Sequence, residues 1–394
     1  MTTAILGAFD RFNYGDLLFP LIADVALDQL GHHRELQAYG LKQSDLRLYQ
    51  AKPTCSLYEL AAQPNLTNLI IGGGEVLGTR WFNMHLHISE PPLTQLLKGT
   101  RKLAGLEPAD QLSRFLLGKQ DTPLPWLLPQ DTFAHHVNIM YNAVGGSSNI
   151  RKLPETHRQY LVTTLEQAAF ISVRDQDTHN VLAELGLPAQ LAPDSAALMK
   201  HLVPALDDHI SEPSRALTQE PYVCFQISKH HAHGRVGEIA AALDQLQQER
   251  KLNILLLPIG RAPAHEDHLA LADIRGAMTT PALMPANDIG IADIMMLIAE
   301  SEVFVGSSLH GAITAMAFAV AHLAFPEVAK VQRYLTTWDI PEQQISTSTE
   351  TLLADVERVL SIDKTTREHL AERLEQASWG NFQAMVDVIN ASSS

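Results

Sequence analysis

The sequence is poor in cysteine and in positive charge. Only Cys55 and Cys224 occur among its 394 residues. Two cysteines are too few for a disulfide framework or a cysteine zinc site, and the pair fits a reducing cytoplasm. Lysine and arginine number 29 against 44 aspartates and glutamates, so the formal net charge is −15. A surface that binds nucleic acid needs a basic footprint, and we therefore expect no nucleic-acid partner. An anionic small molecule is not excluded, because local cations and backbone amides decide its binding.

Long apolar runs are also missing. A membrane-spanning helix needs roughly 18 or more apolar residues in succession, and the best candidate, 312–325, is shorter and contains His322. The first residues, MTTAILGAFDRFNYGD, lack a basic segment followed by a long apolar one, so we expect no signal peptide. These absences predict a cytoplasmic protein without a membrane span. They leave open a peripheral contact with a membrane that carries the substrate.

The chain has the composition of a well-packed globular protein and the length of two domains. Apolar residues make up 46% of the sequence and charged residues 19%, and 394 residues exceed one ordinary core. Short apolar strands alternate with helical patterns, which predicts an α/β fold with parallel sheets covered by helices. A polar stretch at 207–221 reads as a linker between Rossmann-like domains at 1–206 and 222–394. The two domains would face a cleft, and the last part, 347–389, would be mostly helical.

The expected strands are short, and one region between them is irregular. Before the linker they lie at 3–9, 35–39, 46–49, 66–71, 137–144, 170–173 and 190–192. After the linker we expect strands at 222–227, 253–258, 282–284, 303–305 and 320–325. Residues 78–129 carry prolines and weak helical patterns, which indicates an insertion or a lid.

The stretch 303–318, VFVGSSLHGAITAMAF, indicates an anion site. A buried strand is followed by a tight turn and a helix that starts near Leu309, with Ser307 or Ser308 as its N-cap. Unpaired amides and the positive end of the helix dipole favour an anion there. His310 falls in the first turn, where the neutral imidazole is favoured and could act as a base or a hydrogen-bond donor. A purely structural histidine is the alternative.

Polar residues follow two earlier strands, at the sheet edge where parallel α/β folds bind ligands. Asn13 and Asp16 come after the first strand, and Asp16 could contact a ligand or cap the next helix. Gly73, Gly74 and Glu75 follow a later strand, where glycines allow a close approach to the backbone. The glycines do not match the phosphate-binding motifs for dinucleotides or nucleoside triphosphates, so neither cofactor is expected.

Several cations are available to bind an anionic ligand. Arg174 follows the strand at 170–173 and could clamp a carboxylate or phosphate, or pair with a nearby aspartate. Lys229, Arg261 and Lys330 each follow a strand of the second domain. Three histidines lie close to Lys229, but no carboxylate or cysteine accompanies them, and we predict no metal site.

In their order along the chain, these motifs resemble the polysaccharide pyruvyl transferase family. The segments that carry the resemblance are 13–16, 69–74, 172–175, 193–194 and, above all, VGSSLHGA at 305–312. Lys330 falls where the family often has a lysine after the following strand. The resemblance extends from about residue 3 to residue 335.

The resemblance implies a glycosyltransferase-B-like architecture and a transfer reaction. A pyruvyl unit would pass from phosphoenolpyruvate to a sugar of a surface polysaccharide or its lipid-linked precursor, giving a cyclic ketal and phosphate. Phosphoenolpyruvate would be a co-substrate, with no other cofactor and no metal. The catalytic residues would be His310, Arg174 and Asp16. The donor would be bound by Ser307, Ser308, Leu309, Lys330, Lys229 and Arg261. The acceptor would be bound by Asn13, Gly73, Gly74 and Glu75.

Ser308 departs from the family pattern. Members with pyruvyl transfer activity commonly read Ser-Arg-Leu-His, whereas this chain has Ser-Ser-Leu-His at 307–310. Serine offers one neutral hydrogen bond where arginine offers a charged fork. A different cation would have to take its place, and the candidates are Lys229, Arg261, Lys330 and Arg333.

Two other functions are open to the same fold. One is a nucleotide-sugar-dependent glycosyltransferase, in which Glu327 would contact the ribose. The other is a non-catalytic glycan-binding relative, in which replacement of His310 would change no measurable behaviour.

Overall fold

The computed structural model describes residues 2–33, 35–89, 91–117, 122–262 and 265–391. Its first half is built on a seven-stranded, all-parallel sheet with the strand order β3-β2-β1-β4-β5-β6-β7. The strands are β1 (Thr2–Leu6), β2 (Leu36–Gly40), β3 (Thr54–Ser56), β4 (Leu66–Gly72), β5 (Asn138–Val144), β6 (Phe170–Val173) and β7 (Gln190–Leu191). Every side chain of β5 is buried, which is typical of a parallel sheet covered on both faces.

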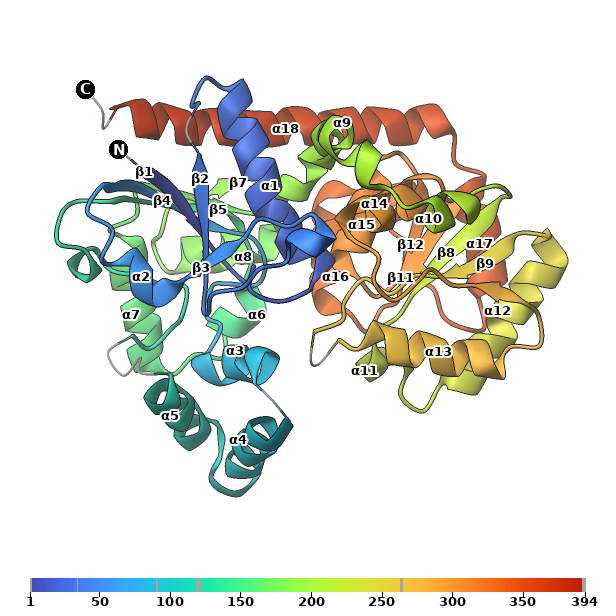
Figure 1. Ribbon diagram of the computed structural model, residues 1–394, viewed down its shortest axis with the longest axis horizontal. Helices are drawn as coiled ribbons and strands as arrows, with labels where there is room; N and C mark the ends of the chain where they lie inside the picture. The colour runs from blue at the N-terminus through green and yellow to red at the C-terminus, as the bar shows by residue number, and fades with distance from the viewer. Residues whose placement is uncertain (1, 34, 90, 118–121, 263–264, 392–394) are drawn as a thin grey trace.

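A second all-parallel sheet has five strands in the order β10-β9-β8-β11-β12. The strands are β8 (Tyr222–Gln226), β9 (Asn253–Leu256), β10 (Ala282–Leu283), β11 (Val303–Gly306) and β12 (Ala321–Ala324). Figure 1 shows the two sheets in the two halves of the molecule, each with helices around it. The predicted α/β class with two Rossmann-like domains is confirmed.

Helices connect the strands in both halves. In the first half they are α1 (Tyr14–Gln29), α2 (Leu57–Leu60), α3 (Trp81–Ile88), α4 (Pro91–Ala104), α5 (Leu106–Leu116), α6 (Ser147–Ile150), α7 (Glu155–Leu165) and α8 (Gln176–Glu184). After β7 they are α9 (Val203–Leu206), α10 (Glu212–Ala216), α11 (Lys229–Ala232), α12 (Val236–Arg250), α13 (Asp267–Ala277), α14 (Ile291–Ala299), α15 (Leu309–Ala317), α16 (Ala329–Trp338), α17 (Leu352–Leu360) and α18 (Lys364–Ala391). Short 3-10 helices are η1 (Arg47–Tyr49), η2 (Gln130–Thr132), η3 (Ser195–Leu202), η4 (Asp207–His209) and η5 (Pro341–Gln343).

One hydrophobic core continues from the first sheet to the second. It joins Ile5 and Ile70 of the first sheet to Cys224 and Phe304 of the second, through α1, η3, α14 and α15. The long helix α18 runs across both halves (Figure 1). Its Asn381 Nδ2 donates a hydrogen bond to Asn142 Oδ1 on β5 over 2.7 Å. The two sheets are therefore held together by a shared core, and the division at 207–221 remains a proposal.

Some details differ from the sequence-based expectations. The strand predicted at 46–49 is wrong, because Arg47 pairs with Asp45 over 2.6 Å in a local turn and Leu48 is 76% exposed. The edge of the first sheet is β3 instead. The irregular region 78–129 contains the helices α3, α4 and α5, and its residues 118–121 lie outside the described ranges. None of the described helices is both long and apolar enough to cross a membrane.

Candidate active site

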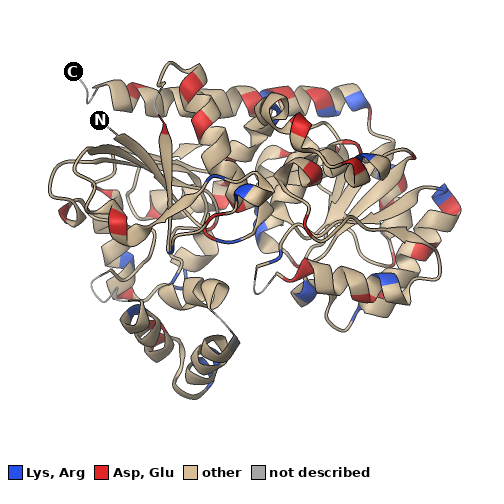
Figure 2. Cartoon of the chain, in the orientation of Figure 1, with Lys and Arg blue, Asp and Glu red and all other residues tan. Residues whose placement is uncertain are grey.

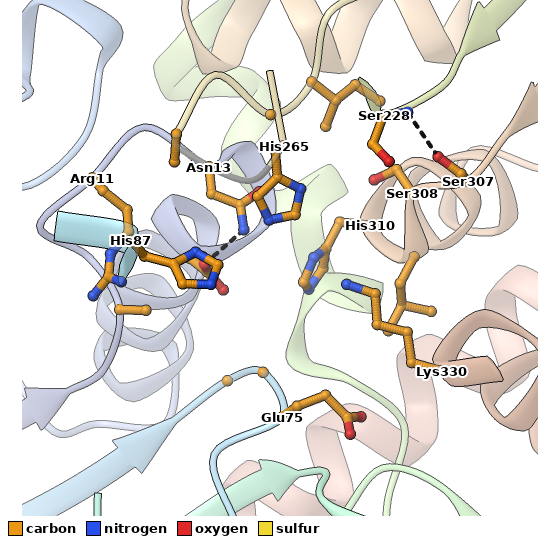
Figure 3. A pocket seen from close by; sticks show the side chains of 18 of the residues that line it. Arg11, Asn13, Glu75, His87, Ser228, His265, Ser307, Ser308, His310 and Lys330 are labelled. Atoms are coloured by element: carbon orange, nitrogen blue, oxygen red, sulfur yellow. Dashed lines mark hydrogen bonds between the residues drawn. The ribbon is translucent and has the colours of Figure 1, made fainter. Parts of the chain in front are cut away.

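A pocket of about 340 Å³ opens between the carboxyl ends of the two sheets. The structure brings most of the predicted site residues to this pocket, namely Asn13, Asp16, Gly73, Gly74, Glu75, Arg174, Ser307, Ser308, Leu309, His310 and Lys330. Figure 3 shows the side chains around it, with Glu75 on one side and the start of α15 on another. Residues more than 300 positions apart in the sequence therefore form one site.

The predicted helix start is present at the second sheet. β11 ends at Gly306 and α15 begins at Leu309. The Oγ atom of Ser308 accepts a hydrogen bond from the Gly311 amide over 3.2 Å. Of the two N-cap candidates, the structure therefore uses Ser308.

Ser307 is fixed by a chain of hydrogen bonds that reaches Asp267. The Ser307 amide donates to Gln226 Oε1 over 3.0 Å, and Gln226 Nε2 donates to Asp267 Oδ2 over 2.7 Å. The amides of Ile259 and Gly260 donate to the same Oδ2 atom over 3.1 and 2.8 Å. Burial raises the pKa of Asp267 to about 6, against the lowering effect of these hydrogen bonds. These hydrogen bonds connect the start of α15 to the loop after β9.

His310 is held between the two halves of the molecule. Its side chain is almost completely buried, and Nε2 lies 3.6 Å from Asp194 Oδ2. This distance is long for a direct hydrogen bond but short enough for electrostatic attraction. The ring packs edge-on against Phe19 and lies against the backbone of Gly15 on α1. A carboxylate behind an imidazole orients it and stabilises the imidazolium that forms when it takes a proton.

Arg174 lines the pocket and also belongs to a buried network of ion pairs. Its Nη1 lies 2.8 Å from Asp194 Oδ2, and its Nη2 lies 3.1 Å from Glu75 Oε1. Arg333 Nη2 lies 3.3 Å from the other Glu75 oxygen. Burial opposes the charge on Asp194, but His310 and Arg174 outweigh it and lower the pKa of Asp194 to about 2. Pairing with an aspartate, the alternative considered for Arg174, is thus what the structure shows.

Lys330 reaches the pocket from the first turn of α16 and is half-buried. Its ammonium forms no ion pair or hydrogen bond with any residue in the described ranges. Burial lowers the pKa of Lys330, and the charge of Arg174 lowers it further. Figure 3 shows the side chains of Lys330 and His310 directed toward each other. An anion in the pocket would meet this cation next to the start of α15.

Two predicted donor ligands do not line the pocket. Lys229 Nζ pairs with Glu266 Oε2 over 3.3 Å, and both side chains are solvent-exposed. The Arg261 guanidinium lies 4.5 Å from the ring centre of Phe12 and donates a hydrogen bond to the Ile289 carbonyl. The geometry gives neither residue a donor-binding role.

The ribose contact considered for a nucleotide-sugar donor also finds no support in the geometry. Glu327 pairs with Arg235 over 3.0 Å and does not line the pocket.

Two pocket histidines were missed by the sequence-based reasoning. His87 comes from α3 and His265 from the loop before α13, with ring centres 6.2 Å apart (Figure 3). Burial, aided by the charge of nearby cations, lowers the pKa of each to about 4, so both are neutral near pH 7. His265 follows a strand of the second sheet, which is a usable signal, whereas α3 lies in a region without a clear pattern. Within the described residues, no three His, Cys, Asp or Glu side chains are grouped to hold a metal, and metal-independence stays a prediction.

The sheets and the pocket between them define a class of protein, the two-domain glycosyltransferase-B architecture. UDP-GlcNAc 2-epimerase from Neisseria meningitidis, bound to UDP-GlcNAc, matches with a TM-score of 0.53 at 10% identity, covering 99% of this chain and 100% of that one. The S. aureus MnaA–UDP complex matches with a TM-score of 0.54 at 14% identity, covering 99% and 96%. Trehalose-6-phosphate synthase OtsA gives 0.52 at 12% identity, covering 98% and 99%. At such identities the likeness shows the fold alone.

The family is narrower than this class. The polysaccharide pyruvyl transferase family model matches residues 13–327, which is most of the chain. The protein therefore belongs to the polysaccharide pyruvyl transferase family and is a transferase, as the motifs predicted. No curated protein sequence matches it.

Proposed function

We propose that this protein transfers a pyruvyl group from phosphoenolpyruvate to a sugar of a surface polysaccharide or its lipid-linked precursor. The reaction would take place in the cytoplasm with phosphoenolpyruvate as the only co-substrate. The observation that carries the proposal is Lys330, a half-buried cation that lines the pocket and forms no direct ion pair or hydrogen bond with any described residue. Phosphoenolpyruvate carries a phosphate and a carboxylate, and Lys330 together with the start of α15 offers an ammonium and helix amides to one of them.

The reaction needs proton transfers at two places. A sugar hydroxyl attacks C2 of phosphoenolpyruvate and loses its proton, while the C3 methylene gains a proton and becomes a methyl group. The C2–O bond to phosphate then breaks, and a second hydroxyl adds to C2 and closes the ketal. The released phosphate carries the proton of the second hydroxyl, so atoms and charge balance. His310, backed by the Asp194 carboxylate, suits one of these transfers, an effect of about 10²- to 10⁴-fold on rate.

Asp16 is the carboxylate best suited to orient the acceptor sugar. Asn13 Nδ2 donates a hydrogen bond to Asp16 Oδ2 over 2.7 Å, which fixes the Asp16 side chain at the pocket. Glu75 forms ion pairs with Arg174 and Arg333. We therefore assign Glu75 to positioning these two arginines as well as to binding the sugar. Gly74 leaves backbone surface open to the acceptor, whereas the missing side chain of Gly73 makes room for the ring of Phe19.

A ligand panel and a product assay test this function. Thermal unfolding would be followed with phosphoenolpyruvate, pyruvate and several nucleotide sugars, since a ligand stabilises the folded state as RT ln(1 + [L]/Kd). We expect stabilisation by phosphoenolpyruvate, and release of phosphate when a suitable glycan is added. His310→Ala should abolish phosphate release, and cooperative unfolding of the variant, at a temperature lowered by the cavity in this buried site, would show that the variant is still folded.

Other results would point to the alternative functions. Stabilisation by a nucleotide sugar, with phosphoenolpyruvate inert, would replace the proposal with a glycosyltransferase. Glycan binding without any turnover, unaffected by His310→Ala, would indicate a non-catalytic relative.

A further inference from the structure

The helices α4 and α5 carry an unusual concentration of exposed apolar side chains. Among the described residues, eight large apolar side chains are exposed, and five of them lie on this helical pair. They are Leu96, Leu103, Leu106, Phe115 and Leu116. Leu103 is 90% exposed and Phe115 is 65% exposed, so these rings and branches are in contact with solvent. Exposed apolar groups gathered on one unit mark an interaction surface.

The same pair of helices carries basic charge, although the whole chain is acidic. Lys98, Arg101 and Lys102 are exposed on α4, and Figure 2 shows Lys and Arg on this helix. The two acidic residues of the pair, Glu107 and Asp110 on α5, both contact Arg80, at 2.8 and 3.1 Å. The pair contains four basic residues, Lys98, Arg101, Lys102 and Arg114, against these two acidic ones, so its charge is positive, whereas the whole chain carries −15.

The helical pair is firmly attached to the pocket wall. Asp110 Oδ1 accepts a hydrogen bond from the Phe82 amide at the start of α3, over 2.8 Å. Phe82 also packs with Leu97 and Ala109 in a small separate core between α3 and the pair. The next turn of α3 supplies His87 to the pocket. A surface that binds α4 and α5 would thus lie at a fixed place relative to the pocket.

We propose that α4 and α5 bind the surface of an anionic lipid bilayer. Apolar side chains would enter the headgroup region while Lys98 and Lys102 contact lipid phosphates, as in helices that lie in a membrane interface. In a symmetric contact between two copies the same basic side chains would face one another and repel, so the basic charge favours the anionic bilayer as the occupant. Docking would bring the pocket to a lipid-linked acceptor, and this consequence rests on the proposed function. The binding of α4 and α5 to the bilayer does not depend on it.

Vesicle flotation of the full chain tests the docking without any substrate. Wild-type protein should float with vesicles of mixed phosphatidylglycerol and phosphatidylcholine, and remain unbound with phosphatidylcholine alone. Leu103→Glu combined with Phe115→Glu should abolish flotation. Lys98→Gln combined with Lys102→Gln should weaken binding by a factor of about 25, since each charge near an anionic surface contributes roughly fivefold. Leu48→Glu, at an apolar residue that is 76% exposed elsewhere, is the matched control and should float like the wild type.

Three outcomes overturn the docking. They are a wild type that does not bind anionic vesicles, a double glutamate variant that binds equally, and a wild-type dimer that this variant dissociates. The last result would assign the surface to a second copy of the chain. Since no donor is present in the assay, vesicle binding can succeed even where pyruvyl transfer fails, and the two proposals are judged separately.

Discussion

Gly15 on α1 lies directly against the imidazole ring of His310 on α15. A Cβ atom on Gly15 would be 1.8 Å from His310 Nδ1 and 2.0 Å from Cγ, far inside van der Waals contact. Only a residue without a side chain lets the starts of the two helices approach so closely. The ring is thereby confined between the Gly15 backbone and the Asp194 carboxylate.

Gly15→Ala should lower activity without unfolding the protein. Gly15 is the second residue of α1, and its helical backbone conformation is one that alanine adopts readily. The overlap with His310 forces the ring to move, so we expect kcat to fall roughly 100-fold, the scale of losing a positioned acid–base group. Steady-state pyruvyl transfer and thermal unfolding of the purified variant measure the two effects.

Gly380→Ala is the matched control for this substitution. Gly380 lies inside α18, and no atom is within 4 Å of the position that its Cβ would take. The control should keep full activity and gain stability. Full activity in Gly15→Ala would show that the observed position of His310 is not needed for the reaction.

Lys330→Met should weaken the binding of phosphoenolpyruvate. Loss of a charged hydrogen bond in a partly buried site is worth about 1.5–3 kcal/mol, so KM for the donor should rise roughly 10- to 100-fold. Lys229→Met removes a cation that pairs with Glu266 outside the pocket, and it should leave KM unchanged. Equal effects of the two substitutions on KM would remove Lys330 from the donor site.

Ser308→Arg should restore part of the donor affinity lost in Lys330→Met. If Lys330 supplies the charge that the Ser-Arg-Leu-His members place in their motif, an arginine at 308 can replace it. Ser308→Ala in the same background is the control, because it removes the N-cap of α15 at a loss of about 1 kcal/mol without adding charge. If KM recovers equally when Lys330→Met is combined with Ser308→Arg and with Ser308→Ala, an arginine at 308 does not replace the charge of Lys330.

The fold could be predicted where strands are buried on both faces. β6 was predicted with its observed bounds, 170–173, because three of its four residues, Phe170, Ile171 and Val173, are apolar, as is typical of a buried parallel strand. The edge strand β3 has only three residues and gives no such run, so the pattern at 46–49 was mistaken for it. The shared core and the crossing of α18 depend on tertiary packing and have no local signal.

The sequence predicted which residues lie near the site, but not the directions that their side chains take. Asn13, Arg174 and Lys330 follow strand ends, and parallel topology brings such positions together. Lys229 and Arg261 also follow strand ends, yet an ion pair and an aromatic face hold their side chains elsewhere. The direction that a long side chain takes is set by partners distant in sequence, which spacing does not reveal.

Asp194→Asn should destabilise the protein strongly near pH 7. The substitution leaves the buried Arg174 with a single carboxylate partner, and breaking a buried ion pair costs about 3 kcal/mol or more. The folded-state pKa of Asp194 is about 2, below the usual 3.8, so its stabilisation is complete above pH 3.8 and is lost as the pH falls toward 2. Urea unfolding at several pH values measures this trend.

Asp45→Asn is the control for the buried pair. The exposed ion pair with Arg47 also lowers the pKa of Asp45 to about 2, but solvent screens it. We expect no measurable change in the free energy of unfolding for this variant. If Asp194→Asn also leaves the free energy of unfolding unchanged, the buried ion pairs do not stabilise the protein.

Asp267→Asn should show the opposite dependence on pH. The three donors on Oδ2 can also bind an asparagine oxygen, so the hydrogen bonds survive the substitution. The folded-state pKa of about 6 lies above the usual 3.8, so Asp267 favours folding below pH 3.8 and loses this contribution as the pH rises through 6. A shift of this size corresponds to up to about 3 kcal/mol. Relative to the wild type, the variant should therefore gain stability between pH 4 and pH 7.

Asp244→Asn serves as the reference for the pH series. Four hydrogen bonds from Thr279 and Thr280 lower the pKa of Asp244 to about 2 against the effect of burial, and the residue does not line the pocket. Its stabilising contribution is complete above pH 3.8, so the difference from the wild type should be constant between pH 4 and pH 7. If Asp267→Asn also differs from the wild type by a constant amount over this range, then the Asp267 carboxyl ionises normally in the folded protein.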